Sequence, residues 1–143
     1  MTPTVRDVLQ GFVVAVTSPP STEAGPEYLA GRAGMLSMLA MLAAQEAERA
    51  PAATIAENAA IRALFAEALA YDATLDGALA AAAAERDENL ATPALDATNA
   101  RLRRLVIALH ERVEEAGDVE IDRRIVDLYG AMARGRRLLL PGS

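Results

Sequence analysis

The longest uncharged apolar stretch of the chain covers residues 33–44 and is rich in methionine and leucine. It lies inside a segment that we expect to be helical from about Pro26 to Arg49, with Pro51 ending it. Because most of this segment is apolar on every side, the pattern predicts a central helix that is buried by its neighbours. Three methionines at three-residue spacing are expected in the core with it: Met35, Met38 and Met41.

An earlier segment also has apolar residues at helical spacing, and the period predicts a helix that begins at Thr2-Pro3. The β-branched residues between Phe12 and Val16 leave a strand as the competing interpretation. Ser18 and the two prolines after it end the segment, and residues 21–25 form a loop inside one domain. The apolar positions that set the helical period are Val5, Val8, Leu9, Phe12, Val13 and Val16.

Two more helices are expected in the middle of the chain. Thr54 and Glu57 have the spacing of a capping box and predict a helix that ends near Tyr71. Thr74 is a suitable cap for the next helix, which passes through five alanines to about Leu90, with residues 85–89 in solvent. The apolar face of the first of these two helices consists of Ile61, Leu64, Phe65 and Ala68.

The last third of the chain has the clearest amphipathic pattern. Thr92-Pro93 predicts a helix start and Gly117 a helix end, because glycine readily adopts the left-handed conformation found there. Asp118 is placed to cap the helix that follows. The turn is short, so the two helices are expected to form an antiparallel hairpin. The two apolar stripes are Leu95, Thr98, Leu102, Leu105, Val106, Leu109 and Val113, and then Ile121, Ile125, Leu128 and Met132.

Composition agrees with these patterns. The 143 residues are 52% hydrophobic and only 3% aromatic, with alanine the dominant helix former. A chain of this length can build one real core. The sequence therefore predicts one all-α domain over residues 1–143, a compact bundle of five or six helices with a C-terminal antiparallel helical hairpin.

Several classes of chemistry are excluded or disfavoured. The chain has no cysteine, and all 14 of its cationic residues are arginine, so a cysteine nucleophile and a Schiff-base lysine are impossible. The alanine and arginine bias is typical of a GC-rich, bacterial genome. The net charge of −6 disfavours a nucleic-acid partner. The N-terminus lacks a signal-peptide pattern and the uncharged run is too short to cross a bilayer, so we expect a cytoplasmic protein without a membrane partner.

The single histidine, His110, is the first candidate for specific chemistry. Glu114 lies one helical turn further on and could hold its imidazole. Di-iron bundles use Glu-x-x-His motifs, but the position three residues before His110 is Ile107. A boundary histidine with a surface hydrogen bond is therefore favoured over a metal ligand, and no cofactor is expected. Ser37 is expected to bond back to a helical carbonyl instead of acting as a nucleophile.

Three residues are candidate ligand-binding groups. Arg32 precedes the uncharged run and needs a partner or an anion if it is buried. Tyr129 is amphipathic and could line a pocket beside the central helix together with Arg32 and His110. Two arginine clusters lack the interleaved aromatics that single-strand binding uses. Their members are Arg101, Arg103 and Arg104, and then Arg134, Arg136 and Arg137.

The absence of any motif with catalytic spacing favours a non-catalytic interaction or oligomerisation module. The large share of apolar residues indicates association, and a symmetric homodimer is the commonest arrangement. Another protein is the second partner that we consider. The alternative is a ligand-binding or enzymatic bundle that uses Arg32, His110 and Tyr129. A metal protein is a third and weaker hypothesis.

Overall fold

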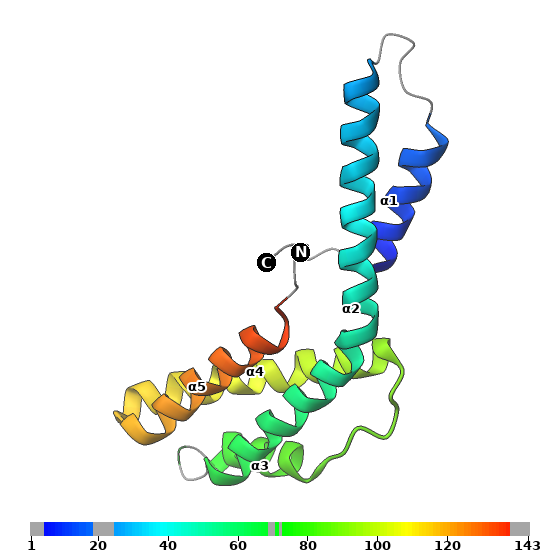
Figure 1. The fold of residues 1–143 in the computed structure, drawn as a ribbon. Helices are drawn as coiled ribbons and strands as arrows, with labels where there is room; N and C mark the ends of the chain where they lie inside the picture. Colours follow the sequence, from blue (N-terminus) through cyan, green and yellow to red (C-terminus); the bar gives the residue numbers. More distant parts are fainter. Residues whose placement is uncertain (1–4, 19–24, 69–70, 72, 138–143) are drawn as a thin grey trace. The chain divides into compact units, whose positions relative to one another are not determined.

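The computed structural model describes residues 5–18, 25–68, 71 and 73–137. Over these residues the chain forms helices and no strand, so the predicted all-α class is confirmed (Figure 1). The N-terminal segment is a helix and not the competing strand; the expected start at Thr2-Pro3 falls outside the described residues. The five helices are α1 (Val5–Thr17), α2 (Pro26–Glu67), α3 (Ala73–Ala84), α4 (Thr92–Ala116) and α5 (Val119–Gly135).

The chain divides into two compact units, which are described separately. The first contains the described residues up to Arg49, and the second contains the described residues from Ala50 to Arg137. Helix α2 belongs to both, and the division falls next to Pro51, which lies inside the helix. The single domain over residues 1–143 stays a prediction.

The predicted break of the chain at Pro51 is wrong, because α2 runs through it. Proline removes one helical hydrogen bond and crowds the preceding turn. Here it is surrounded by alanines, the strongest helix formers, so the helix continues on both sides. Five described helices therefore replace the six that a break would give. The capping box of Thr54 and Glu57 is wrong for the same reason, since neither residue lies at a helix N-terminus.

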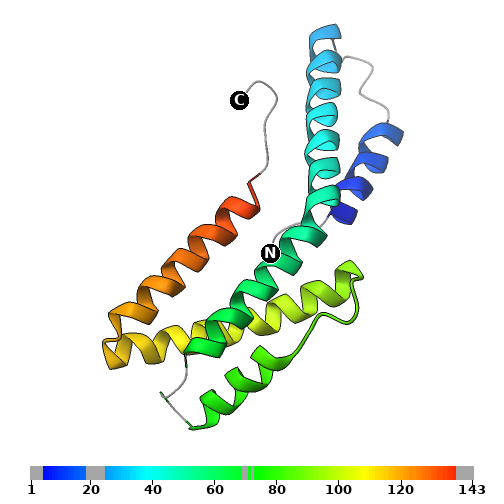
Figure 2. The ribbon, with the colours of Figure 1, turned by 60° about the horizontal axis from the view of Figure 1, so that its bottom comes forward.

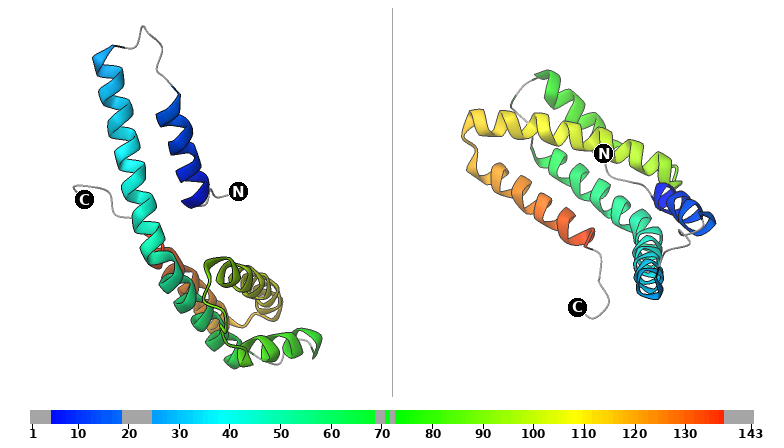
Figure 3. Two further views of the ribbon diagram at one scale, coloured as in Figure 1. Left: turned by 90° about the vertical axis from the view of Figure 1, so that its right-hand side faces the viewer. Right: turned by 90° about the horizontal axis from the view of Figure 1, so that it is seen from above.

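In the first unit, α1 lies antiparallel to residues 26–49 of α2 (Figures 1 and 3). Val8 and Phe12 are half-buried on one face of α1, and Leu36 is half-buried on α2. Among the described residues of this unit, only Ala43 is buried. The prediction that residues 33–44 are buried on all sides, methionines included, is therefore wrong. Among the residues described in this unit, each helix has only the other as a neighbour, which covers one of its faces and leaves the rest exposed.

The second unit is built from residues 50–67 of α2 together with α3, α4 and α5, and it contains a real core. The predicted apolar face of Ile61, Leu64, Phe65 and Ala68 is fully or almost fully buried. It packs against the buried stripes of the hairpin and against α3. The core residues of the hairpin and of α3 are Leu79, Ala82, Leu102, Val106, Leu109, Val113, Ile125, Leu128 and Met132.

The predicted C-terminal hairpin is confirmed, and Figure 2 shows α4 and α5 running antiparallel from the turn that joins them. Gly117 ends α4 in the left-handed conformation, with φ of 69°. Oδ1 of Asp118 accepts hydrogen bonds from the backbone N–H groups of Glu120 and Ile121, with both N–O distances at 3.1 Å, and so caps α5. At the other end of α4 the N-cap is Ala91, one residue before the predicted Thr92, and it makes no side-chain capping bond.

Helix α3 ends at Ala84, although the pattern predicts continuation to about Leu90. Residues 85–90 are not helical. Most of residues 85–89 are exposed, as predicted. The exception is Asp87, whose side chain is only 8% exposed and makes an ion pair with Arg62 of α2. The buried ion pair with Arg62 explains why the chain leaves the helical path after Ala84, because a helix that continued would not have to bring Asp87 to this arginine.

The turn between α4 and α5 gives a test of the fold. We expect Gly117→Ala to destabilise the protein by about 1–2 kcal/mol, because an L-residue is strained in the left-handed conformation. Gly77→Ala in α3 is the matched control and should stabilise by about 0.5–1 kcal/mol, since its added methyl group meets no atom within 4 Å. Urea unfolding followed by circular dichroism measures both. Changes of the same sign would contradict the assigned turn.

Candidate functional site

The first candidate site is a surface of the first unit on which large apolar side chains are exposed. Val13 of α1 is 63% exposed and Met35 of α2 is 62% exposed. Gly31 and Gly34 leave open space, since a Cβ added at either would meet no atom within 4 Å. We call this set the apolar hairpin surface: Leu9, Val13, Val14, Val16, Tyr28, Leu29, Met35, Met38, Leu39 and Met41.

The helices that carry this surface have long uncharged segments. No charged residue occurs in residues 8–17 of α1 or in residues 33–45 of α2. The Ser37 hydroxyl donates to the carbonyl of Ala33 at 2.9 Å, as predicted, so this polar group is satisfied within its own helix. Exposed apolar surface of this extent is more typical of an interaction site than of a surface that stays in water.

Arg32 fastens the two helices of the first unit to each other. Its Nη2 atom donates to the carbonyl oxygens of Ala15 and Ser18, the second at 3.2 Å. These carbonyls lie at the C-terminal end of α1, where helical carbonyls have no partner within their own helix and a cation is favourable. The guanidinium of Arg32 therefore has a structural use in this unit.

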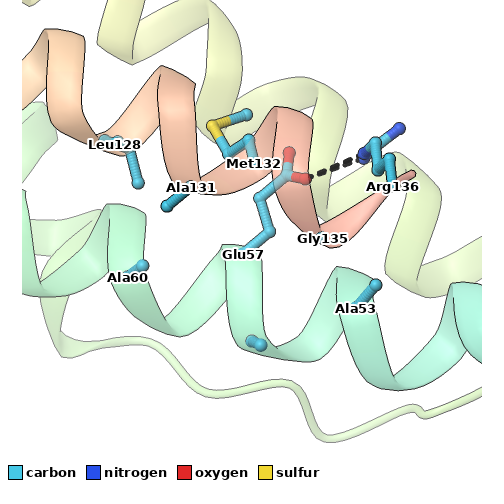
Figure 4. Close-up of a pocket in the computed structure, with 9 residues that line it drawn as sticks. Ala53, Glu57, Ala60, Leu128, Ala131, Met132, Gly135 and Arg136 are labelled. Carbon is cyan, nitrogen blue, oxygen red and sulfur yellow. Dashed lines mark hydrogen bonds and ion pairs between the residues drawn. The ribbon is translucent and has the colours of Figure 1, made fainter.

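The second candidate site is a buried polar network in the second unit, centred on Glu57 of α2. Its carboxylate is 4% exposed and is bound from two other helices. Asn99 of α4 donates to Oε1 at 2.8 Å. Nε of Arg136, at the C-cap of α5, donates to Oε2 at 3.0 Å (Figure 4). Arg103 of α4 has its Nε 3.9 Å from Oε1. One carboxylate thus links α2, α4 and α5.

The network continues from Asn99 toward the non-helical segment after α3. Asn99 Nδ2 also donates to Oδ1 of Asn58 at 3.0 Å, and Asn58 Nδ2 donates to Asp87 at 3.2 Å. Arg62 binds the same carboxylate through both Nη atoms, at 3.0 and 2.8 Å. The Arg62 guanidinium holds the pKa of Asp87 below its usual value. The buried Nε of Arg62 has no hydrogen-bond partner among the described residues.

An apolar groove of about 280 Å³ lies beside Glu57, between α2 and α5. Figure 4 shows the two helices antiparallel, with the Glu57 side chain reaching from α2 to Arg136 at one end. Most of the other lining side chains are small. The groove is lined by Ala53, Ala56, Glu57, Ala60, Leu128, Ala131, Met132, Gly135 and Arg136.

A second, polar cavity of about 610 Å³ lies at the hairpin turn. The Tyr71 hydroxyl donates to Oδ2 of Asp118 at 2.6 Å. Burial, together with this hydrogen bond to a carboxylate, raises the pKa of Tyr71 to about 12. Arg124 pairs there with Glu67 and with Glu120, the latter at 3.0 Å. Because Arg124 and Tyr71 already engage three carboxylates, the cavity is built chiefly as a structural junction.

The three predicted ligand-binding residues divide between the units. Arg32 lies in the first unit, whereas His110 and Tyr129 lie in the second with ring centroids 5.9 Å apart. His110 Nε2 lies 3.0 Å from Asp122, closer than the 3.8 Å to the predicted Glu114. None of the three lines either cavity. A shared ligand site for them stays a prediction.

The sequence interpretation missed the buried network, although one signal was present. Asn99 occupies the position between Leu95 and Leu102 on the buried stripe of α4, where an apolar residue is expected. A polar residue at such a position requires a hydrogen-bonding partner. Glu57 and Arg62 give no comparable signal, because acidic and basic residues are common on exposed helix faces.

The described residues contain no group of three or more metal-ligating side chains, and none of the described helices is both long and apolar enough to cross a membrane. Comparison with protein-family models, with curated proteins and with solved structures finds no match for this chain.

The network predicts that two arginines contribute unequally to the free energy of unfolding. We expect Arg62→Leu to destabilise the protein by about 3–5 kcal/mol, because it leaves the Asp87 carboxylate buried without its cation. Arg101→Leu is the control. Its partner Glu85 is 45% exposed, so its loss should cost less than about 1 kcal/mol. Urea unfolding at neutral pH measures both, and the double variant Arg62→Leu/Asp87→Leu should recover most of the loss. Equal losses in the two single variants would contradict the network.

Tyr71 predicts an alkaline loss of stability. Its folded pKa of about 12 lies above the ordinary value, so the native state favours the neutral phenol. The resulting stability is complete below pH ~10 and is lost as pH rises from about 10 toward 12. Phenolate absorbance of the wild type minus that of Tyr71→Phe should titrate at about 12. Asp118→Asn should lower this midpoint only in part, since burial is the larger cause. An unshifted midpoint near 10 would refute the contact.

Proposed function

We propose that this chain is an oligomerisation module that forms a homodimer through the apolar hairpin surface. The observation that carries the proposal is the exposure of ten large apolar side chains in a unit where, among the described residues, only Ala43 is buried. Pairs of helices are stable when their apolar faces are covered. Two copies of α1 and residues 26–49 of α2 would meet as a four-helix bundle about a two-fold axis.

A second copy suits this surface electrostatically. A symmetric interface brings each patch against its own copy, so a charged patch would repel itself. Eight of the ten side chains of the apolar hairpin surface lie in segments without charged residues, 8–17 and 33–45. Self-association therefore brings no like charges from these segments together, and the open face at Gly31 and Gly34 leaves room for close approach.

The amount of exposed apolar surface is sufficient for association. Burying the remaining half of ten side chains on both copies sets an upper limit of roughly 15–30 kcal/mol, at about 1.5–3 kcal/mol for a complete side chain. Association itself costs about 4–15 kcal/mol. A pairing that covers only part of the surface is therefore enough for a stable dimer.

Sedimentation equilibrium over a concentration series tests the proposal. We expect a dimer at micromolar concentration, and Val13→Glu or Met35→Glu should raise its dissociation constant at least a hundredfold, because each places like charges across the interface. Both side chains are largely exposed in one copy, so helix content should be unchanged.

The matched control is Ile107→Glu, which makes the same kind of change at a 56% exposed position of the second unit. It should leave the dimer intact. A wild-type chain that is monomeric at every concentration would refute the proposal, and it would point to another protein or to the rest of the chain as the cover. A dimer that withstands both Val13→Glu and Met35→Glu would place the interface elsewhere.

A further inference from the structure

The groove between α2 and α5 is left open by small side chains on both of its walls. Ala53, Ala56 and Ala60 of α2 line it opposite Ala131 and Gly135 of α5 (Figure 4). Helices with small facing side chains can approach each other closely. Here a space of about 280 Å³ nevertheless remains between them. The space between them is therefore not filled by the protein, although interiors are normally close-packed.

Helix α5 also packs against α4, its partner in the hairpin. At one end of the groove the Glu57–Arg136 ion pair connects α2 to the end of α5. Apolar spaces of this kind hold water poorly, because the walls offer it few hydrogen bonds. An apolar molecule would replace that water favourably.

The polar end of the groove has a surplus of positive charge. Two arginines, Arg136 and Arg103, lie within 4.0 Å of the single carboxylate of Glu57. The Arg136 side chain is 47% exposed and uses Nε and Nη2 for Glu57 and Asn99. Its Nη1 atom has no partner within the part of the chain that the structure describes. A guanidinium with a free N–H edge at the mouth of an apolar slot favours an anionic group, and a carboxylate in particular.

We propose that this groove binds an amphipathic monocarboxylate, with its apolar tail between the alanines and its carboxylate on Arg136. The volume limits the tail. At about 30 Å³ for each small group, as for liquid water, 280 Å³ holds roughly nine non-hydrogen atoms. From Leu128 to Arg136 the helix rises about 12 Å, which fits an extended chain of this size. The ligand is thus a medium-chain carboxylate of about eight carbons.

Isothermal titration calorimetry of the full chain with sodium octanoate tests this directly. Octanoate should bind with one site per chain, at least tenfold tighter than 1-octanol, which has the tail without the charge. Octylammonium, which has the same tail with the opposite charge, should bind more weakly than 1-octanol. Equal affinity for the three compounds would refute the assignment of the carboxylate to Arg136.

A pair of variants on one helix locates the ligand. Ala131→Leu fills the groove and should weaken octanoate at least tenfold, while Ala133→Leu makes the same change on α5 at an exposed position outside the lining and should have no effect. Leucine is a good helix former, so neither variant should unfold the protein. Absence of octanoate binding at millimolar concentration, or identical binding to both variants, would overturn the proposal. Arg136→Gln should weaken octanoate but not 1-octanol, which separates pairing with the head group from damage to the fold.

Discussion

The second unit depends on one buried carboxylate. Glu57 accepts hydrogen bonds from Asn99 on α4 and from Arg136 at the end of α5, and Asn99 extends the contact through Asn58 to Asp87. Apolar packing between α2, α4 and α5 is not directional, and helices can slide along such a contact at small cost. Buried polar groups cannot, because each displaced bond leaves a donor or acceptor unsatisfied. The network therefore determines the register of the helices, while the apolar core supplies most of the stability.

The helices themselves could largely be predicted from the sequence. Local signals such as the Gly117-Asp118 turn act through backbone conformation and capping, which depend on near neighbours in the chain. The end of α3 and the continuation of α2 through Pro51 could not be predicted, because in each case local conformational preferences compete with other contributions to the free energy. Asp87 leaves the helical path for a distant arginine, and the alanines around Pro51 outweigh its missing N–H. Predicted helix boundaries are wrong where the competing contributions to the free energy are of similar size.

Burial is a separate matter from helix formation. The segment around Met35 and Met38 is apolar on every side, which establishes that it favours burial but not what would bury it. In this unit α1 is too narrow to cover more than one face. The candidate sites show the same limit. Asn99 could have been singled out from its place on the apolar stripe, whereas Arg136 looks like any arginine near a helix C-terminus until its distance to Glu57 is known.

The two units thus differ in how their apolar residues are satisfied. In the second unit, most large apolar side chains lie in a common core, and a buried polar network links the helices around it. In the first unit, polar groups such as Ser37 and Arg32 are satisfied by backbone carbonyls, and the large apolar side chains remain uncovered. A surface with its polar groups satisfied loses no hydrogen bonds when water leaves it. Desolvation of the apolar hairpin surface therefore carries only a small polar penalty, and for this reason association is the physical outcome that its composition favours.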